Sequence, residues 1–92
     1  MPRNRKDLEA GLSKKGFQRK DGDHHFFIYL TADGRKSRVF TKTSHSVKDI
    51  TDDLLSQMAR QCKITKQNFF RLIDCPLLRE EYERILRDTG WL

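Results

Sequence analysis

Two adjacent histidines directly after a turn are the residues of this 92-residue chain that suggest chemistry most strongly. They stand in the segment Gly22-Asp23-His24-His25, which lies between two stretches rich in lysine and arginine. An imidazole gains and loses a proton near neutral pH, so a histidine held beside a phosphodiester can act as a general acid or base. Because successive residues of a strand face opposite sides, only one of the two histidines can point toward such a ligand.

Motifs for other kinds of catalysis do not occur in the sequence. It contains no glycine-rich phosphate loop, no nucleophile elbow, and no histidines and carboxylates at the spacing of a metal site. Cys62 and Cys75 have neither a C-x-x-C spacing nor an adjacent histidine, which argues against a disulfide framework and a zinc site. We therefore expect buried thiols in a reducing compartment, and no metal or cofactor.

All of the net charge of +6 lies in the first half of the chain. Residues 1–50 carry twelve lysines and arginines against six acidic residues, whereas residues 51–92 carry seven of each. A face that binds a polyanion requires such a concentration of positive charge. The sequence therefore predicts contact with nucleic acid, and the candidate RNA-binding residues are Lys15, Arg19, Lys20, Arg35, Lys36, Arg38, Lys42 and His45.

One helix and three strands are expected around the histidines. Asn4 can cap a helix over residues 5–15, and Gly16 can end it in a left-handed conformation. Runs of aromatic and branched residues, separated by Asp-Gly turn signals, predict strands over residues 17–20, 24–31 and 37–41. These strands should form an antiparallel meander, with the histidine pair at the start of its second strand.

Further helices are expected in the second half. Apolar side chains at every fourth position predict a helix that ends near Cys62. Its start has two candidates, because Thr51 can cap it and Ser46 with Asp49 forms a competing capping box. Thr65 can cap a short third helix that stops before Pro76, and a final helix should cover about residues 77–88.

Size and composition predict one domain of the α+β class over residues 1–92. A chain of 10.9 kDa is too short for two independent cores, and its nine aromatic residues favour a folded chain over a disordered one. The longest apolar run, residues 26–30, is far shorter than a membrane span, and no secretory signal precedes it. We expect a cytoplasmic protein with helices packed on one face of a three-stranded sheet.

Several landmarks occur together in the order known from one family. The most specific is the Gly-x-His-His turn at residues 22–25. Lys15-Gly16-Phe17 precedes it, and it is followed by Asp33-Gly34-Arg35, by a strand that leads to His45, and by Gln61-Cys62-Lys63-Ile64-Thr65 with Phe69 beyond. With these landmarks, residues 5–70 resemble the HicA toxins of HicA/HicB toxin–antitoxin modules. Residues 71–92 form a C-terminal helical extension beyond that pattern.

The resemblance to HicA implies a fold, an activity and a partner. The implied fold is like that of a double-stranded-RNA-binding domain, with the element order α-β-β-β-α. The implied activity is that of an mRNA endoribonuclease, or mRNA interferase, with one essential histidine after the Gly-x turn. This histidine corresponds to His24, with His25 as its substitute, and a HicB-like antitoxin would cover the active face.

Roles can be assigned to these residues as a hypothesis. The RNA 2′-hydroxyl would attack the neighbouring phosphate without a metal, His24 would move a proton, and Lys36, Arg38 or Lys42 would stabilise the charge on the phosphoryl oxygens. The second proton transfer stays open among His25, His45, Tyr29 and water. Two other classes of function also stay open: a non-catalytic RNA-binding module, and an interaction protein whose basic face docks an acidic partner.

Overall fold

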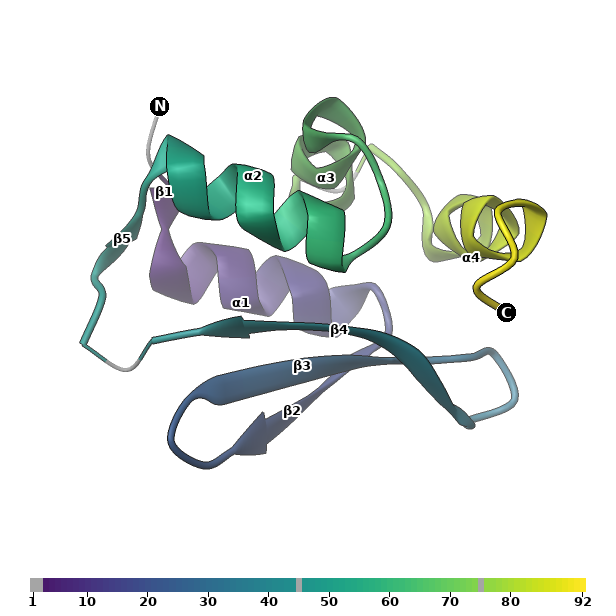
Figure 1. The fold of residues 1–92 in the computed structure, drawn as a ribbon, viewed down its shortest axis with the longest axis horizontal. Helices are drawn as coiled ribbons and strands as arrows, with labels where there is room; N and C mark the ends of the chain where they lie inside the picture. Colours follow the sequence, from purple (N-terminus) through teal and green to yellow (C-terminus); the bar gives the residue numbers. More distant parts are fainter. Residues whose placement is uncertain (1–2, 45, 75) are drawn as a thin grey trace.

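Three antiparallel strands form the central sheet of the computed structural model, which describes residues 3–44, 46–74 and 76–92 (Figure 1). β2 (Phe17–Asp21), β3 (His25–Leu30) and β4 (Lys36–Thr43) lie in the order β2-β3-β4. They confirm the expected meander, and β4 begins one residue earlier and ends two residues later than the sequence pattern indicates. The longer β4 carries Lys42 to the same end of the sheet as the histidine pair.

α1 (Arg5–Lys14) begins and ends where its capping residues predict. The Asn4 side chain accepts a hydrogen bond from the backbone N–H of Asp7, which satisfies one of the free donors of the first turn. Gly16 follows the helix with a φ of 94°, in the left-handed region that favours glycine. The chain therefore turns directly from α1 into β2.

α2 (Asp52–Gln61) and α3 (Lys66–Ile73) both begin at a threonine cap. The side chains of Thr51 and Thr65 each accept a hydrogen bond from the backbone N–H three residues further on. Of the two candidate starts for α2, the structure therefore has Thr51 and not Ser46. The predicted cap of α3 is confirmed.

A second, two-stranded sheet joins the start of the chain to the segment before α2. β1 (Arg3–Asn4) pairs antiparallel with β5 (Asp49–Ile50). This pairing was not expected, because strands of two residues have no detectable alternation of polar and apolar side chains. It fixes the N-terminal end of α1 beside the N-terminal end of α2.

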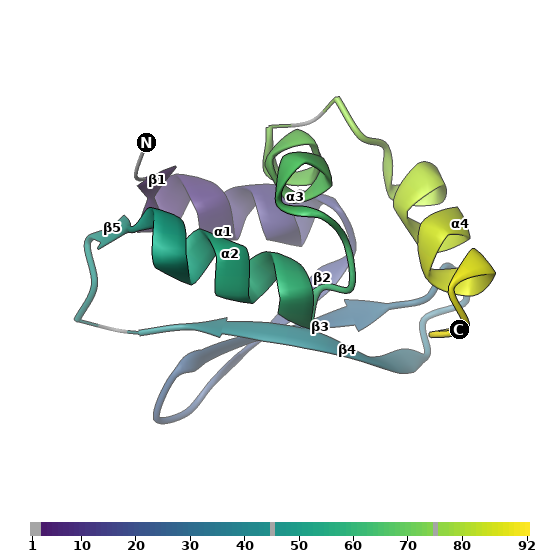
Figure 2. The ribbon, with the colours of Figure 1, turned by 45° about the horizontal axis from the view of Figure 1, so that its top comes forward.

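α4 (Arg79–Asp88) packs at one end of the sheet and begins about two residues later than expected (Figure 2). Tyr82 and Leu86 on this helix are fully buried. The Arg79 guanidinium donates a hydrogen bond of 2.8 Å to the carbonyl oxygen of Leu30, at the end of β3. The C-terminal extension therefore contributes to the core of the same domain.

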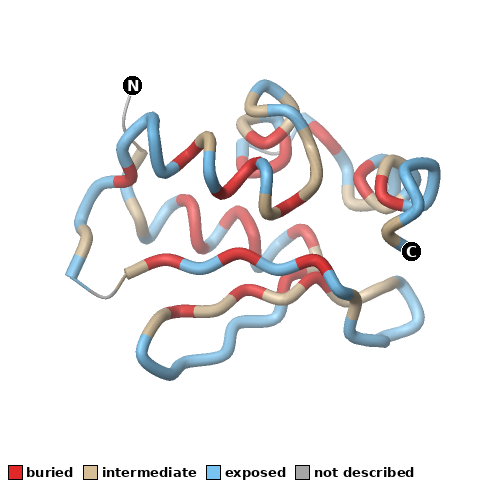
Figure 3. Tube along the Cα trace, in the orientation of Figure 1, coloured by how far each residue is buried: buried red, intermediate tan, exposed pale blue. Residues whose placement is uncertain are grey.

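The helices lie on one face of the three-stranded sheet, and no described element covers the opposite face (Figure 2). Burial follows this division along the strands (Figure 3). Phe27 and Thr41 face the helices and are fully buried, whereas Phe40 is 49% exposed. The architecture is α+β, as expected. In the ranges that the structure describes, no helix has the length and apolar character that a membrane crossing requires.

Gly11 allows α1 and α3 to approach each other closely. A Cβ atom at this position would lie 2.5 Å from the backbone oxygen of Ile73, so one of the two backbones would have to move. Alanine in a helix interior is ordinarily about 1 kcal/mol more favourable than glycine. Here, however, Gly11→Ala should lower the free energy of unfolding by about 1–3 kcal/mol, because the site is overpacked. Urea denaturation measures this change, with the exposed Ser13→Ala in the same helix as the control. A Gly11→Ala protein as stable as the wild type would contradict the close approach.

Candidate active site

His24 and His25 point to opposite sides of the sheet, as strand geometry requires. His25, the first residue of β3, is only 6% exposed and faces the helices. His24 is partly exposed, and its ring lies edge-on to the ring of Phe26 at 6.2 Å between centroids. The two imidazoles therefore have different surroundings, and each must be assigned its own role.

Glu9 of α1 holds the His25 ring in place. Nδ1 of His25 lies 2.9 Å from a carboxylate oxygen of Glu9, and Nε2 lies 3.3 Å from the guanidinium of Arg19. The guanidinium of Arg5 also lies 3.1 Å from Nδ1, so this nitrogen contacts both a carboxylate and a guanidinium. Both ring nitrogens are thus occupied within the fold, which makes His25 a structural residue.

The carboxylate of Glu9 also accepts hydrogen bonds from Arg5 at 3.2 Å and from the Thr43 hydroxyl at 2.5 Å. Burial alone would raise the pKa of Glu9. The hydrogen bonds from Thr43, His25 and Arg5 act against burial and leave the pKa lowered overall. Glu9 is therefore an ionised group at neutral pH that ties α1 to the ends of β3 and β4. In the sequence, only the four-residue spacing between Arg5 and Glu9 points to this role of Glu9. Ordinary ion pairs on the surface of a helix have the same spacing, so the role could not be recognised from it.

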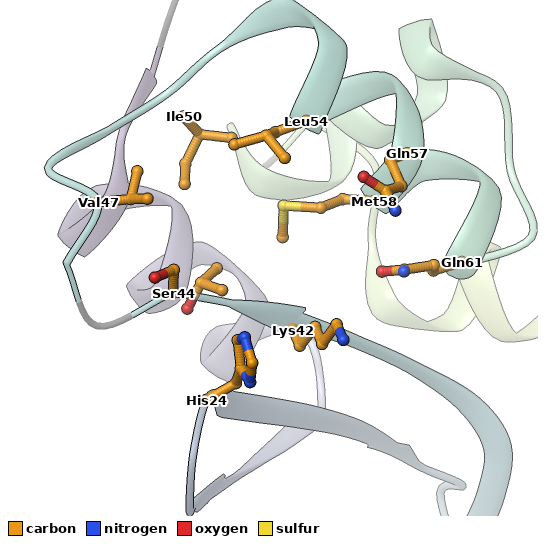
Figure 4. Close-up of a pocket in the computed structure, with 10 residues that line it drawn as sticks. His24, Lys42, Ser44, Val47, Ile50, Leu54, Gln57, Met58 and Gln61 are labelled. Atoms are coloured by element: carbon orange, nitrogen blue, oxygen red, sulfur yellow. The ribbon is translucent and has the colours of Figure 1, made fainter.

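His24 lines a pocket of about 150 Å³ between the end of β4, the segment that follows it, and α2 (Figure 4). Lys42 and Ser44 lie beside His24 on the strand side of this pocket, and α2 contributes side chains from the other side. We call it the His24 pocket. Its complete lining is His24, Lys42, Thr43, Ser44, Val47, Ile50, Leu54, Gln57, Met58 and Gln61.

The uncovered face of the sheet carries basic and aromatic side chains in alternation. The strand register pairs Lys20 with Phe26 and Phe26 with Lys42, so these three residues form one row across the sheet. Phe40 lies in the next row, opposite Ile28. We call this surface the open sheet face; it consists of Gln18, Lys20, Phe26, Ile28, Phe40 and Lys42. Because Lys42 also lines the His24 pocket, the open sheet face and the pocket are continuous.

The other predicted RNA-binding residues do not gather at His24. Arg35 lies in the turn between β3 and β4 and pairs with Asp33 at 3.2 Å. Lys36 and Arg38 belong to the first half of β4, and the Arg38 guanidinium lies 5.9 Å from the centre of the Trp91 ring. Arg19 lies on the helix side of β2 and pairs with Asp21 and, at 3.9 Å, with Glu9. His45 is outside the described residues.

Lys15, predicted as an RNA contact, has a buried position inside the fold. Its side chain is buried, with 7% of the residue exposed. The ammonium group donates hydrogen bonds to the backbone oxygens of Leu72 at 2.9 Å and Leu77 at 2.6 Å. Lys15 therefore closes the end of α3 onto α1, and its charge does not reach a ligand.

Tyr29, one of the candidates for the second proton transfer, does not reach the solvent. Its ring is fully buried and its hydroxyl donates a hydrogen bond of 2.7 Å to Glu83. Burial, together with this bond to Glu83, raises the pKa of Tyr29 to about 12. It therefore cannot supply the second proton transfer at His24, which lies at the other end of β3.

Cys62 is a buried thiol, as expected, and burial raises its pKa. Cys75 lies outside the described residues. Within residues 3–44, 46–74 and 76–92, no three side chains of histidine, cysteine, aspartate or glutamate form a group that suits a metal ion. The polar groups that line the His24 pocket are one imidazole, one ammonium group, two hydroxyls and two amides.

Comparison of the chain with protein-family models, with curated proteins and with solved structures finds no match. The resemblance to HicA therefore rests on the landmark residues of the sequence.

Proposed function

We propose that this chain is a toxin-type endoribonuclease similar to the HicA proteins, which cleaves mRNA by proton transfer at His24. One observation carries this proposal: His24 is partly exposed to the solvent and lies beside Lys42, at the edge of the open sheet face. The alternation of lysines with aromatic rings on that face suits a single RNA strand, because lysines contact phosphates and rings stack on bases. The order α1-β2-β3-β4-α2, with both helices on one face, supports the proposal of a fold like that of double-stranded-RNA-binding domains.

The reaction requires only the RNA, His24, Lys42 and water. The 2′-oxygen attacks the adjacent phosphorus as its proton passes to the imidazole of His24. The bond from phosphorus to the 5′-oxygen of the next nucleotide breaks, and water gives that oxygen a proton. The hydroxide that is left takes the proton from His24, which restores the neutral imidazole. The products are a 2′,3′-cyclic phosphate and a 5′-hydroxyl. The ammonium group of Lys42 stabilises the negative charge that develops on the phosphoryl oxygens.

A single strand fits the open sheet face better than a duplex does. Stacking on Phe26 or Phe40 requires an accessible base face, which paired bases in a helix do not offer. The likeness to a duplex-binding fold does not decide the substrate, because unrelated activities occur on the same fold. We therefore propose unpaired regions of mRNA as the substrate.

The proposed function is tested by incubating the purified protein, in the presence of a chelator, with an unstructured RNA and with DNA of the same sequence. We expect the RNA to be cleaved and the DNA to be bound but left intact, since DNA lacks the attacking hydroxyl. RNA that is bound in a salt-dependent manner, but stays intact, would identify the chain as a non-catalytic RNA-binding module.

Phe40 provides a test of the open sheet face as the RNA-binding surface. Phe40→Ala should weaken the binding of single-stranded RNA by about 1–3 kcal/mol, which is the usual contribution of a stacked base. It should have little effect on folding, because half of the residue is exposed. Fluorescence anisotropy with a labelled RNA measures the affinity, and Leu78→Ala, which removes another exposed apolar side chain, is the matched control. Equal affinities of the two variants would mean that RNA does not stack on Phe40.

An antitoxin that neutralises this activity has to cover the same surface. We propose a HicB-like partner with acidic residues opposite Lys20 and Lys42, because these charges are exposed on the open sheet face. Such a partner should compete with RNA for binding. Simultaneous binding of RNA and the partner would place the partner elsewhere on the chain.

A further inference from the structure

We infer that the His24 pocket binds one base of the RNA strand, turned out of the stack beside the phosphate that is cleaved. The inference rests on the proposed function and adds to it the means by which the protein recognises its substrate. Proteins that read RNA sequence usually do so by enclosing unstacked bases in such sites. The size, lining and position of the pocket each support this occupant.

The size of the pocket suits a single aromatic ring system. Its volume of about 150 Å³ is close to that of an apolar cavity known to take up one benzene ring, roughly 150 Å³. Pockets for larger, drug-sized ligands start at roughly 300 Å³. The pocket is therefore too small for a whole nucleotide, and the ribose and phosphate would remain at its mouth.

The lining of the pocket has apolar side chains for the flat faces of a base and polar side chains for its edge. Val47, Ile50, Leu54 and Met58 form apolar walls against which the flat faces of a base can pack. Leu54 is 38% exposed, so part of its side chain is accessible to a ligand at the pocket. The apolar walls alone would suit many ligands, so the polar groups of the lining decide which of them fits.

Hydrogen-bonding groups for the edge of a base come from Ser44, Gln57 and Gln61. The side-chain oxygen of Gln61 accepts a hydrogen bond of 2.6 Å from the hydroxyl of Thr41. This bond orients the amide, so that its nitrogen is the atom that can donate to a ligand. A base has carbonyl oxygens or ring nitrogens that accept such a bond, which an aliphatic ligand lacks.

The positive charge of Lys42 at the mouth of the pocket favours a base of RNA over an aromatic side chain of a protein. Lys42 belongs both to the pocket and to the row Lys20–Phe26–Lys42 of the open sheet face. A strand whose phosphates follow this row reaches His24 with one phosphate at Lys42 and the attached base at the pocket. The occupant is thus linked to an anion, as a nucleotide is and a phenylalanine or tyrosine is not.

Methionine methyl signals allow a direct test of the occupant. The chain has two methionines, and Met58 is the one that lines the pocket. The protein, labelled with ¹³C at the methionine methyl groups, is titrated with each of the four 3′-nucleoside monophosphates while its NMR spectrum is recorded. Ribose 5-phosphate, which has the anion but no base, is the control ligand. We expect at least one nucleotide to shift the Met58 signal progressively to saturation, and ribose 5-phosphate to leave it unchanged.

A variant that fills the pocket completes the test. Leu54→Trp should abolish the nucleotide-induced shift of Met58, whereas Leu78→Trp, at an exposed leucine outside the pocket, should retain it. If no nucleotide moves the Met58 signal of the wild-type protein, the inference is overturned, whether or not the protein cleaves RNA. If nucleotides move it and the wild-type protein leaves RNA intact, the proposed nuclease activity fails and the base site stands.

Discussion

Replacement of His24 by alanine is expected to slow RNA cleavage by at least about 100-fold, the lower end of the usual contribution of general acid–base catalysis. The affinity for RNA should change little, because Lys20, Lys42 and the aromatic rings of the open sheet face remain in place. Single-turnover cleavage in a chelator measures the rate, and binding of a non-cleavable 2′-deoxy strand measures the affinity. A rate loss without an affinity loss would assign His24 to the chemical step.

His25→Ala is the matched control for this prediction. Because His25 bonds to Glu9 and Arg19 inside the fold, its loss should lower stability and leave the cleavage rate of the folded protein close to that of the wild type. The assay is run well below the melting temperature of the variant, with folding checked by circular dichroism. A folded His25→Ala protein that has lost cleavage, beside an active His24→Ala protein, would move the chemistry to the opposite side of the sheet.

Replacement of Glu9 by alanine should have the largest effect on stability. It removes the carboxylate that pairs with the part-buried guanidinium of Arg5 and with the ring of His25. Removing one member of a buried ion pair typically costs about 3–5 kcal/mol, a large part of the roughly 5–15 kcal/mol by which small proteins are stable. Urea denaturation measures the loss, and Glu81→Ala, at an exposed position of α4, should cost less than about 1 kcal/mol.

The pH dependence of stability provides a second check on Glu9, for which Glu9→Gln is used in case the alanine variant does not fold. The pKa of Glu9 is lower in the folded than in the unfolded chain. Its contribution to stability is therefore present above the unfolded pKa and is lost as the pH falls through the folded pKa. Wild-type stability should decline more steeply than that of Glu9→Gln in this acidic range. Parallel declines would show that Glu9 is not the group responsible.

The helix boundaries could be predicted because they depend on local groups. Each of the three helix caps accepts a hydrogen bond from the first turn of its own helix; they are Asn4, Thr51 and Thr65. Gly16 has the left-handed conformation in which glycine commonly ends a helix. The strands around the histidines could be predicted for the same reason, since runs of aromatic and branched residues and the Asp-Gly turns between them are local signals. The opposite orientations of His24 and His25 also follow from strand geometry alone.

The partners of the charged side chains could not be predicted, because they are distant in sequence. Nothing near Lys15 indicates that its ammonium group meets the backbone of Leu72 and Leu77, more than fifty residues away. Glu9 likewise meets His25 and Thr43 only after the sheet has formed against α1. The His24 pocket depends on the placement of α2 over the end of β4, which is a tertiary contact.

The chemistry of the cleaved ends shows whether this chain cleaves RNA by proton transfer at a histidine. The purified wild-type protein is incubated with RNA in a chelator, and the ends of the fragments are identified by mass spectrometry. We expect 2′,3′-cyclic phosphates, or the 3′-phosphates formed from them, together with 5′-hydroxyls. Fragments with 5′-phosphates and 3′-hydroxyls, or bound RNA that stays intact, would contradict it.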